Sequence, residues 1–165
     1  MLSTSSKVMI GVVGVAVVGF LYWVLAPFVV NKTMHEVSPL TPTSQGNIPV
    51  LPFDTAVVPS LLSQGEFASR EHETSGVAQV INDTVGEVLR LENLDSLNGP
   101  DLKVYLATDE TATDFIDLGA LKANRGDTNY SIPAGTDLTK YNKVLIWCRA
   151  FEVLFGAAEL TPANR

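Results

Sequence analysis

The sequence predicts an all-β body, an antiparallel β-sandwich of immunoglobulin-like size, preceded by one N-terminal transmembrane helix. Two observations predict the body: short segments rich in β-branched or aromatic residues recur along it, and turn-forming residues separate them. The third observation, an uncharged run near the N-terminus, predicts the helix. The predicted strand segments are residues 65–70, 76–81, 87–91, 102–107 and 143–148.

The turns between these segments follow from their residue types. Residues 77–81 and 87–91 flank the sequence Asn-Asp-Thr-Val-Gly, which predicts a β-hairpin. A second turn is expected at residues 98–101, which read Asn-Gly-Pro-Asp. Weak helical periodicity is confined to residues 112–118, and a bulge or bend is expected near Arg149, where simple alternation fails. Further loops are expected at residues 117–119 and 132–135.

The N-terminal run covers residues 8–30, which include 23 positions without a charge. At about 1.5 Å per residue a helix of this length spans about 34 Å, enough to cross a hydrocarbon core of about 30 Å. A cleaved signal peptide is the main alternative, but its apolar region is usually shorter, and Pro27 follows the best small residue, Ala26. We therefore expect a retained anchor rather than a signal peptide or a buried core helix.

The flanking charges predict which side of the membrane the body occupies. Lys7 and the terminal amine precede the run, whereas after Lys32 the next Lys or Arg is Arg70. This asymmetry favours a single-pass protein of the cell membrane with its body outside the cytoplasm, in a periplasmic or extracellular space. The expected divisions are a cytoplasmic tail (1–7), the anchor (8–30), a Pro-rich extended linker (31–60), the body (61–160) and a short tail (161–165).

Composition narrows the possible functions. Eleven Lys and Arg stand against eighteen Asp and Glu, giving a net charge of −7, which disfavours binding to nucleic acid. The single cysteine excludes a disulfide within the chain and a multi-cysteine zinc site. Two histidines leave little material for ligands, so no metal site is predicted and no cofactor is identified. No motif predicts a stand-alone enzyme, and a hydrolase is the least favoured class.

Cys148 is the residue on which redox chemistry could be centred. Its thiolate would be both a nucleophile and a metal ligand, although a lone cysteine in an apolar strand is more often inert core. His72, in a polar segment between two strands, is a weaker candidate for a ligand or proton carrier, and a solvated turn is its alternative. Aromatic residues from Trp147 to Phe155 could border a pocket that these two residues share, which makes Cys148, His72 and Trp147 the candidate cofactor-binding residues.

Three Asn-x-Ser/Thr triplets begin at Asn31, Asn82 and Asn129. They are possible glycan acceptors if the body lies outside the cytoplasm. One or two such triplets would occur by chance, so they are weak indicators.

Over about 95 residues the body resembles the DM-thirteen family, small β-rich extracytoplasmic domains linked to electron transfer and discussed beside DOMON domains. The resemblance implies a DOMON-like sandwich, a redox role, and the family's characteristic cysteine at Cys148. The matching residues are Gly65-Glu66-Phe67, His72, Ser75-Gly76, residues 98–106, Asp117-Leu118-Gly119, Leu121-Lys122, Gly126, Asn129-Tyr130, Ile132-Pro133, Tyr141, Val144, Ile146-Trp147-Cys148, Phe151, Val153, Phe155-Gly156, Ala158 and Leu160.

Two function classes remain. The first is a membrane-anchored redox or electron-transfer domain centred on Cys148. The second is a non-catalytic binding module, or an accessory subunit of a membrane or envelope assembly. The expected partners are the lipid bilayer, through residues 8–30, and a protein of such an assembly.

Overall fold

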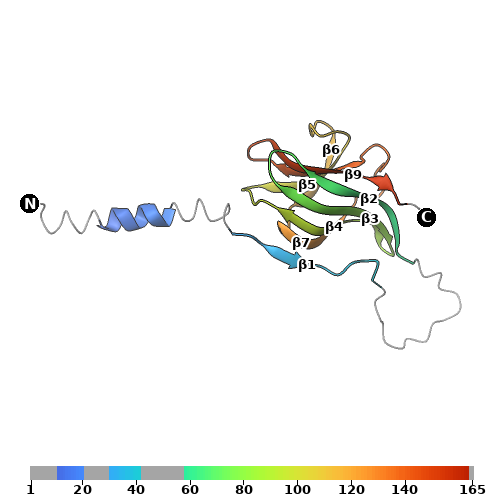
Figure 1. Cartoon of the computed structure of the whole chain (residues 1–165), viewed down its shortest axis with the longest axis horizontal. Helices are drawn as coiled ribbons and strands as arrows, with labels where there is room; N and C mark the ends of the chain where they lie inside the picture. The colour runs from blue at the N-terminus through green and yellow to red at the C-terminus, as the bar shows by residue number, and fades with distance from the viewer. Residues whose placement is uncertain (1–10, 21–29, 42–57, 164–165) are drawn as a thin grey trace, which may run out of the picture.

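The computed structural model describes residues 11–20, 30–41 and 58–163, and Figure 1 shows the β-rich body that most of them form. Residues 11–20 are helical. In chain order the strands are β1 (Thr33–His35), β2 (Ser60–Ser69), β3 (Thr74–Asp83), β4 (Gly86–Ser96), β5 (Leu102–Ala107), β6 (Phe115–Ala120), β7 (Arg125–Ser131), β8 (Lys143–Cys148), β9 (Val153–Glu159) and β10 (Thr161–Pro162).

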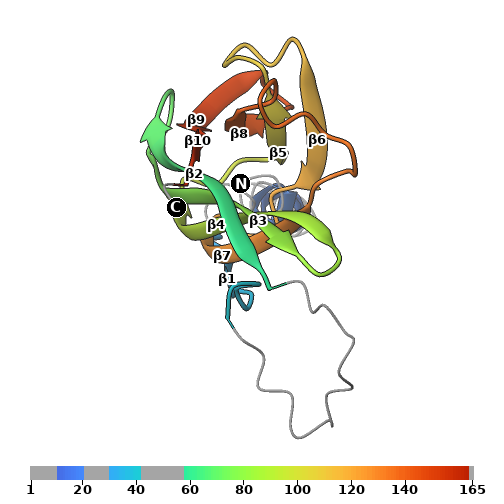
Figure 2. The same cartoon turned by 90° about the vertical axis from the view of Figure 1, so that its right-hand side faces the viewer.

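These strands form one ten-stranded sheet in the order β1-β7-β4-β3-β2-β9-β8-β5-β6, with β10 paired to β2. All pairs are antiparallel except β1 with β7. Figure 2 shows the sheet curling around its core as a half-barrel. The prediction of a mainly antiparallel, all-β body is therefore confirmed, but the two separate sheets of a sandwich are replaced by one curled sheet.

Strand β2 explains why the sheet is continuous. Its first part, Ser60 to Glu66, pairs with β3, and its last part, Phe67 to Ser69, pairs with β9. At Gly65, near the end of the first part, the backbone of Glu159 approaches so closely that a Cβ atom would collide with the Glu159 carbonyl oxygen. A strand that changes partners along its length joins two halves that would otherwise be separate sheets.

The inner face of the curled sheet holds the main core. Its members alternate along the strands, as in Leu89 and Leu91 of β4 or Val144 and Ile146 of β8. A smaller apolar cluster lies on the outer face of β5, β8 and β9, around Tyr105 and Leu145. The half of the sheet containing β8 is thus apolar on both faces.

Comparison with the predicted elements gives a mixed result. The strands predicted at residues 102–107 and 143–148 have the same bounds in the structure, and the predicted hairpin is formed by β3 and β4. The helix indicated by the weak periodicity at residues 112–118 was wrong, because no helix forms there and β6 begins at Phe115. The loop expected at 117–119 is also part of β6, which is an edge strand.

The segment assigned to the linker is not extended away from the body throughout. Residues 33–35 form β1, which pairs with β7, so this part of the segment joins the sheet. Within the described part of the chain, no helix combines the length and hydropathy that a bilayer crossing requires. Residues 8–10 and 21–29 of the predicted anchor lie outside the described residues.

Candidate functional site

Cys148 is the last residue of β8 and is fully buried as a free thiol. Its strand neighbours are Leu102 of β5 and Val153 of β9. It belongs to the inner core together with Val144 and Ile146, which precede it at two-residue intervals on the same face. In this conformation no thiol or reagent in solution can reach the sulfur directly.

A bulge in β9 shapes the region next to Cys148. Ile146 pairs with Gly156, but Trp147 pairs with Leu154, so Phe155 is an extra residue in β9. Val153 and Phe155 both pack against the inner core, whereas Leu154 packs against the outer cluster. The bend expected near Arg149 is a turn over residues 149–152, where Arg149 Nε donates to Asp101 Oδ2 over 2.7 Å. This bond raises the pKa of Arg149.

His72 lies beside this bulge, in the loop between β2 and β3. The backbone amides of Arg70 and Glu71 donate to the carbonyl oxygens of Phe155 (2.9 Å) and Leu154 (3.2 Å), which ties the loop to β9. The imidazole ring of His72 packs on the Phe155 ring, with 4.1 Å between centroids and 55° between planes.

The two side chains border an apolar cavity of about 300 Å³. Its walls come from the loop between β4 and β5, the β8–β9 turn and the start of β9. The lining residues are His72, Leu97, Asn98, Gly99, Pro100, Phe151, Val153 and Phe155. Cys148 does not line this cavity, but its strand partner Val153 does, and both side chains belong to the inner core.

Trp147 is on the other side of β8 from Cys148. It packs with the outer cluster and borders a separate groove of about 520 Å³, together with Tyr105 and Phe115. The rings of Tyr105 and Phe115 stack there with their centroids 4.1 Å apart. The structure therefore brings His72 close to the region of Cys148 but places the third candidate, Trp147, in a different groove.

The three Asn-x-Ser/Thr asparagines differ in their surroundings. Asn31 is exposed, and its Oδ1 accepts a hydrogen bond from Asn124 Nδ2. Asn82 is half-buried near the β3–β4 turn. Asn129 is held at both ends of its amide, because Oδ1 accepts from Arg90 and Nδ2 donates to the carbonyl oxygen of Val37. A glycan on Asn129 would replace one of the two Nδ2 hydrogens and leave one available for this contact with Val37.

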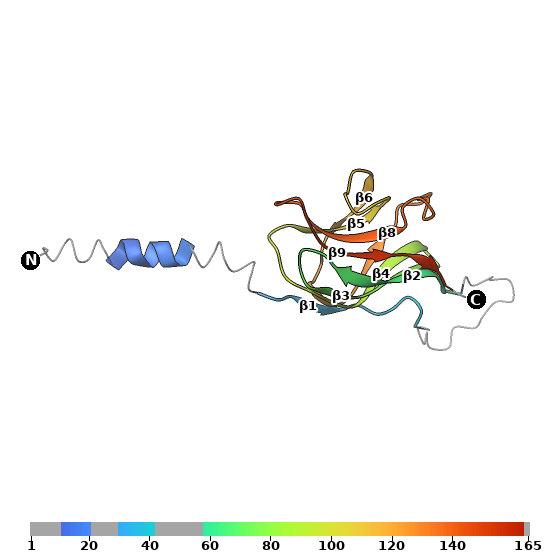
Figure 3. The same ribbon diagram turned by 45° about the horizontal axis from the view of Figure 1, so that its top comes forward.

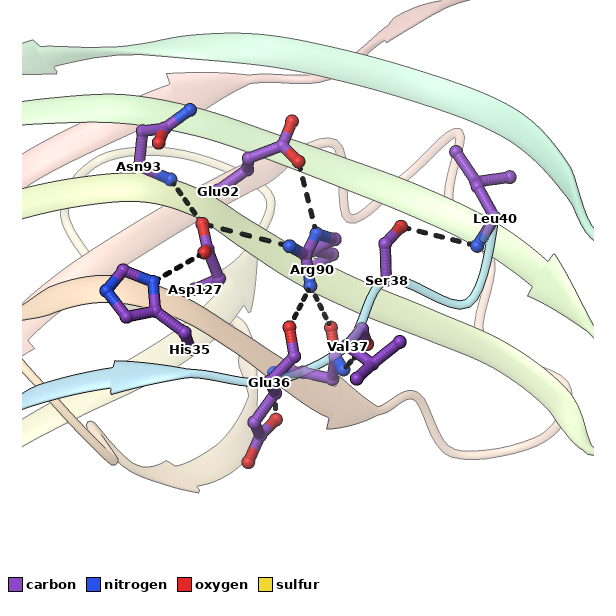
Figure 4. Close-up of polar contacts among 10 residues, drawn as sticks. His35, Glu36, Val37, Ser38, Leu40, Arg90, Glu92, Asn93 and Asp127 are labelled. Carbon is purple, nitrogen blue, oxygen red and sulfur yellow. Dashed lines mark hydrogen bonds and ion pairs between the residues drawn. The ribbon is translucent and has the colours of Figure 1, made fainter. Parts of the chain in front are cut away.

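Sequence reasoning missed a polar cluster on the part of the sheet formed by β1, β7 and β4, which is drawn in Figure 4. Arg90 of β4 is only 4% exposed. Its Nη1 donates to the carbonyl oxygen of Glu36 (3.0 Å) and to Asn129 Oδ1 (3.1 Å), and its Nη2 lies 3.8 Å from Asp127 Oδ1. No signal in the sequence links these residues, because they come from three separate segments.

Asp127 is the second ionised member of this cluster. The backbone amide of Asn93 donates to Asp127 Oδ1 (2.9 Å), and His35 Nδ1 lies 2.8 Å from Oδ2. The Asn93 amide, followed by His35, lowers the pKa of Asp127. Among the described residues, no group of three His, Cys, Asp or Glu side chains is arranged to hold a metal ion.

The fold and the site together define a β-rich domain whose single thiol is buried in the core, on a strand that pairs with a residue lining an apolar cavity bordered by histidine. Residues 66–160 match the DM13 family, described as "Electron transfer DM13", and the chain belongs to this family. The resemblance that the sequence indicated is thereby confirmed. No curated protein and no solved structure matches the chain.

Proposed function

We propose that the protein is a membrane-anchored, extracytoplasmic redox domain in which Cys148 is the electron-transfer centre. The observation that carries this proposal is the pairing of Cys148, which bears the chain's single thiol, with Val153, a lining residue of the His72 cavity. Membership of an electron-transfer family supports the redox class. The uncharged run at residues 8–30 supports anchoring.

The burial of Cys148 restricts how it could act. Direct thiol–disulfide exchange needs an attacking thiolate that can reach the partner's sulfur. A fully buried thiol would act only with a redox group held in the cavity: the thiol would lose one electron to that group and its proton to a base, and the cavity's histidine, His72, is the candidate base. An apolar cavity lined by a few polar side chains, here His72 and Asn98, is the usual form of a small-ligand site.

The test is a voltammetric measurement on the full chain in detergent, compared with its Cys148→Ala and Val144→Ala variants. Val144 is fully buried on the same face of β8, so Val144→Ala is a matched control for lost packing. We expect a reversible wave in the wild type and in Val144→Ala, and none in Cys148→Ala. An unchanged wave in Cys148→Ala, or no wave in the wild type, would contradict the proposal.

A non-catalytic binding module is the second candidate, and the complete burial of Cys148 favours it. In that case the thiol is core, and the cavity beside His72 binds a partner without redox chemistry. Labelling with a thiol reagent at several pH values, with a visible spectrum and metal analysis of the purified protein, distinguishes the two. A colourless, metal-free protein whose thiol reacts only on unfolding, and which has no voltammetric wave, would be a binding module.

A further inference from the structure

The apolar run and the body meet at Val30. Val30 is the last residue of the apolar run, and only Asn31 separates it from Lys32. The side chain of Val30 is 59% exposed. Its carbonyl oxygen accepts a hydrogen bond of 2.7 Å from Asn98 Nδ2, in the loop between β4 and β5. The end of the run is therefore fixed against one particular loop of the body.

Large apolar side chains are exposed around that loop. Leu97 is 49% exposed and Phe151, in the β8–β9 turn, is 63% exposed. Residues 98–100 line both the His72 cavity and a second cavity of about 480 Å³ that Val30 borders. Val30, Leu97, Pro100 and Phe151, here named the apolar rim, thus lie around one loop although they come from three segments of the chain.

The apolar rim lies at one end of the sheet, opposite the β3–β4 turn. Figure 3 shows the β8–β9 turn at the end where β1 begins. The β3–β4 turn is at the other end, because Thr74 pairs with Ser96 at the near end of the hairpin and Asp83 pairs with Gly86 at the far end. Nine residue steps at about 3.3 Å separate the two ends by about 30 Å.

We propose that the apolar rim rests in the interfacial layer of the bilayer, so that the His72 cavity opens toward lipid. This inference rests on the proposed anchor: if residues 8–30 cross the membrane, the hydrogen bond from Asn98 to Val30 holds the rim at its surface. Aromatic and aliphatic side chains such as Phe151 and Leu97 then leave water for the headgroup boundary, which is favourable in proportion to the apolar area buried.

Charges near the apolar rim indicate the kind of lipid. Glu71, Glu73 and Glu152 are exposed beside His72 and Phe151. Of the nearby cations, Arg149 is paired with Asp101 and Lys122 with Glu36, so Lys32, close to Val30, is set against three carboxylates. An anionic surface would repel these carboxylates, so the rim fits a zwitterionic surface.

The test places a nitroxide at Phe151→Cys in the full chain, reconstituted in phosphatidylcholine vesicles. The matched control is Val85→Cys, because Val85 is 92% exposed in the distant β3–β4 turn. Buried Cys148 should not take the label, and the wild type checks this. If the wild type is labelled, both variants are made with Cys148→Ala. We expect the label at residue 151 to be several-fold more accessible to oxygen, relative to a water-soluble nickel reagent, than the label at residue 85.

The outcomes separate this inference from the proposed anchor. Protein that floats with the vesicles while residues 151 and 85 are equally accessible to the nickel reagent would overturn the apolar rim alone. Protein that does not float with the vesicles would overturn the anchor, and the rim with it. A second label at Leu97→Cys should behave like the label at residue 151, and nickel accessibility equal to that at residue 85 would contradict the proposal.

Discussion

The two halves of the curled sheet are stabilised in different ways. In the half formed by β1, β7, β4 and β3, the outer face carries a buried guanidinium, Arg90, among polar partners. In the half formed by β9, β8, β5 and β6, the outer face is apolar around Tyr105 and Leu145, and the inner face contains Cys148. We expect the first half to depend on hydrogen-bond geometry and the second on the volume and polarity of its side chains.

The largest expected effect tests the polar half. Arg90→Ala should lower the free energy of unfolding by about 3–5 kcal/mol, because it removes a buried guanidinium and leaves its half-buried polar partners without that contact. Chemical denaturation measures this loss. Arg125→Ala is the control, since Arg125 pairs with Asp95 at the surface, where an ion pair contributes about 1 kcal/mol or less. Equal losses in the two variants would contradict the distinction drawn between the halves.

The next effect tests the apolar half. Cys148→Ser should cost about 1–3 kcal/mol, because a hydroxyl would replace a thiol in a fully buried, apolar environment. Cys148→Ala removes the sulfur without adding a polar group. Thermal or urea unfolding of both variants separates polarity from volume, and a serine variant as stable as the wild type would show that this part of the core accommodates a polar atom.

The strands that sequence reasoning located best are those buried on both sides. Strands β5 and β8 are nearly continuous apolar runs, so their bounds follow from the residues alone. Strand β7, Arg-Gly-Asp-Thr-Asn-Tyr-Ser, was missed because its polar residues contact β1 and β4 instead of solvent. Strand β9 was missed because the bulge at Phe155 breaks its alternation.

For the site, as for the strands, the sequence indicated individual residues but not the contacts between distant segments. Cys148 and His72 were identified from their chemistry, and the position of His72 near the end of β8 depends on contacts between β9 and the loop after β2. Trp147 was grouped with Cys148 because it is its neighbour in sequence, but successive side chains in a strand point to opposite faces. Arg90, Glu36 and Asp127 could not be grouped, because pairing of β1 with β7 joins segments about 90 residues apart.

Acid should weaken the polar half through Asp127. Its pKa in the folded protein lies below the unfolded value of about 3.9, so the carboxylate contributes stability above that value. The contribution is lost as the pH falls through the folded pKa. Urea unfolding between about pH 5 and pH 2 should therefore show a shallower acid loss in Asp127→Asn than in the wild type. This effect should be smaller than that of Arg90→Ala, and an unchanged slope would contradict it.

The smallest expected effect concerns a contact between the loop after β2 and the loop between β5 and β6. Arg70 Nε and Nη2 donate to Glu110 Oε2 (2.7 Å) and Oε1 (2.6 Å), which raises the pKa of Arg70 and lowers that of Glu110. Both side chains are more than a third exposed, so solvent screens the pair despite its two-point geometry.

We expect a double-mutant cycle with Arg70→Ala and Glu110→Ala to give a coupling of about 0.2–1 kcal/mol that decreases in high salt. Arg90→Ala should retain most of its effect in the same salt, because Arg90 is shielded from solvent. A coupling between Arg70 and Glu110 as large as the Arg90 effect would mean that an exposed ion pair contributes as much as the buried guanidinium, and would contradict the difference drawn between the halves.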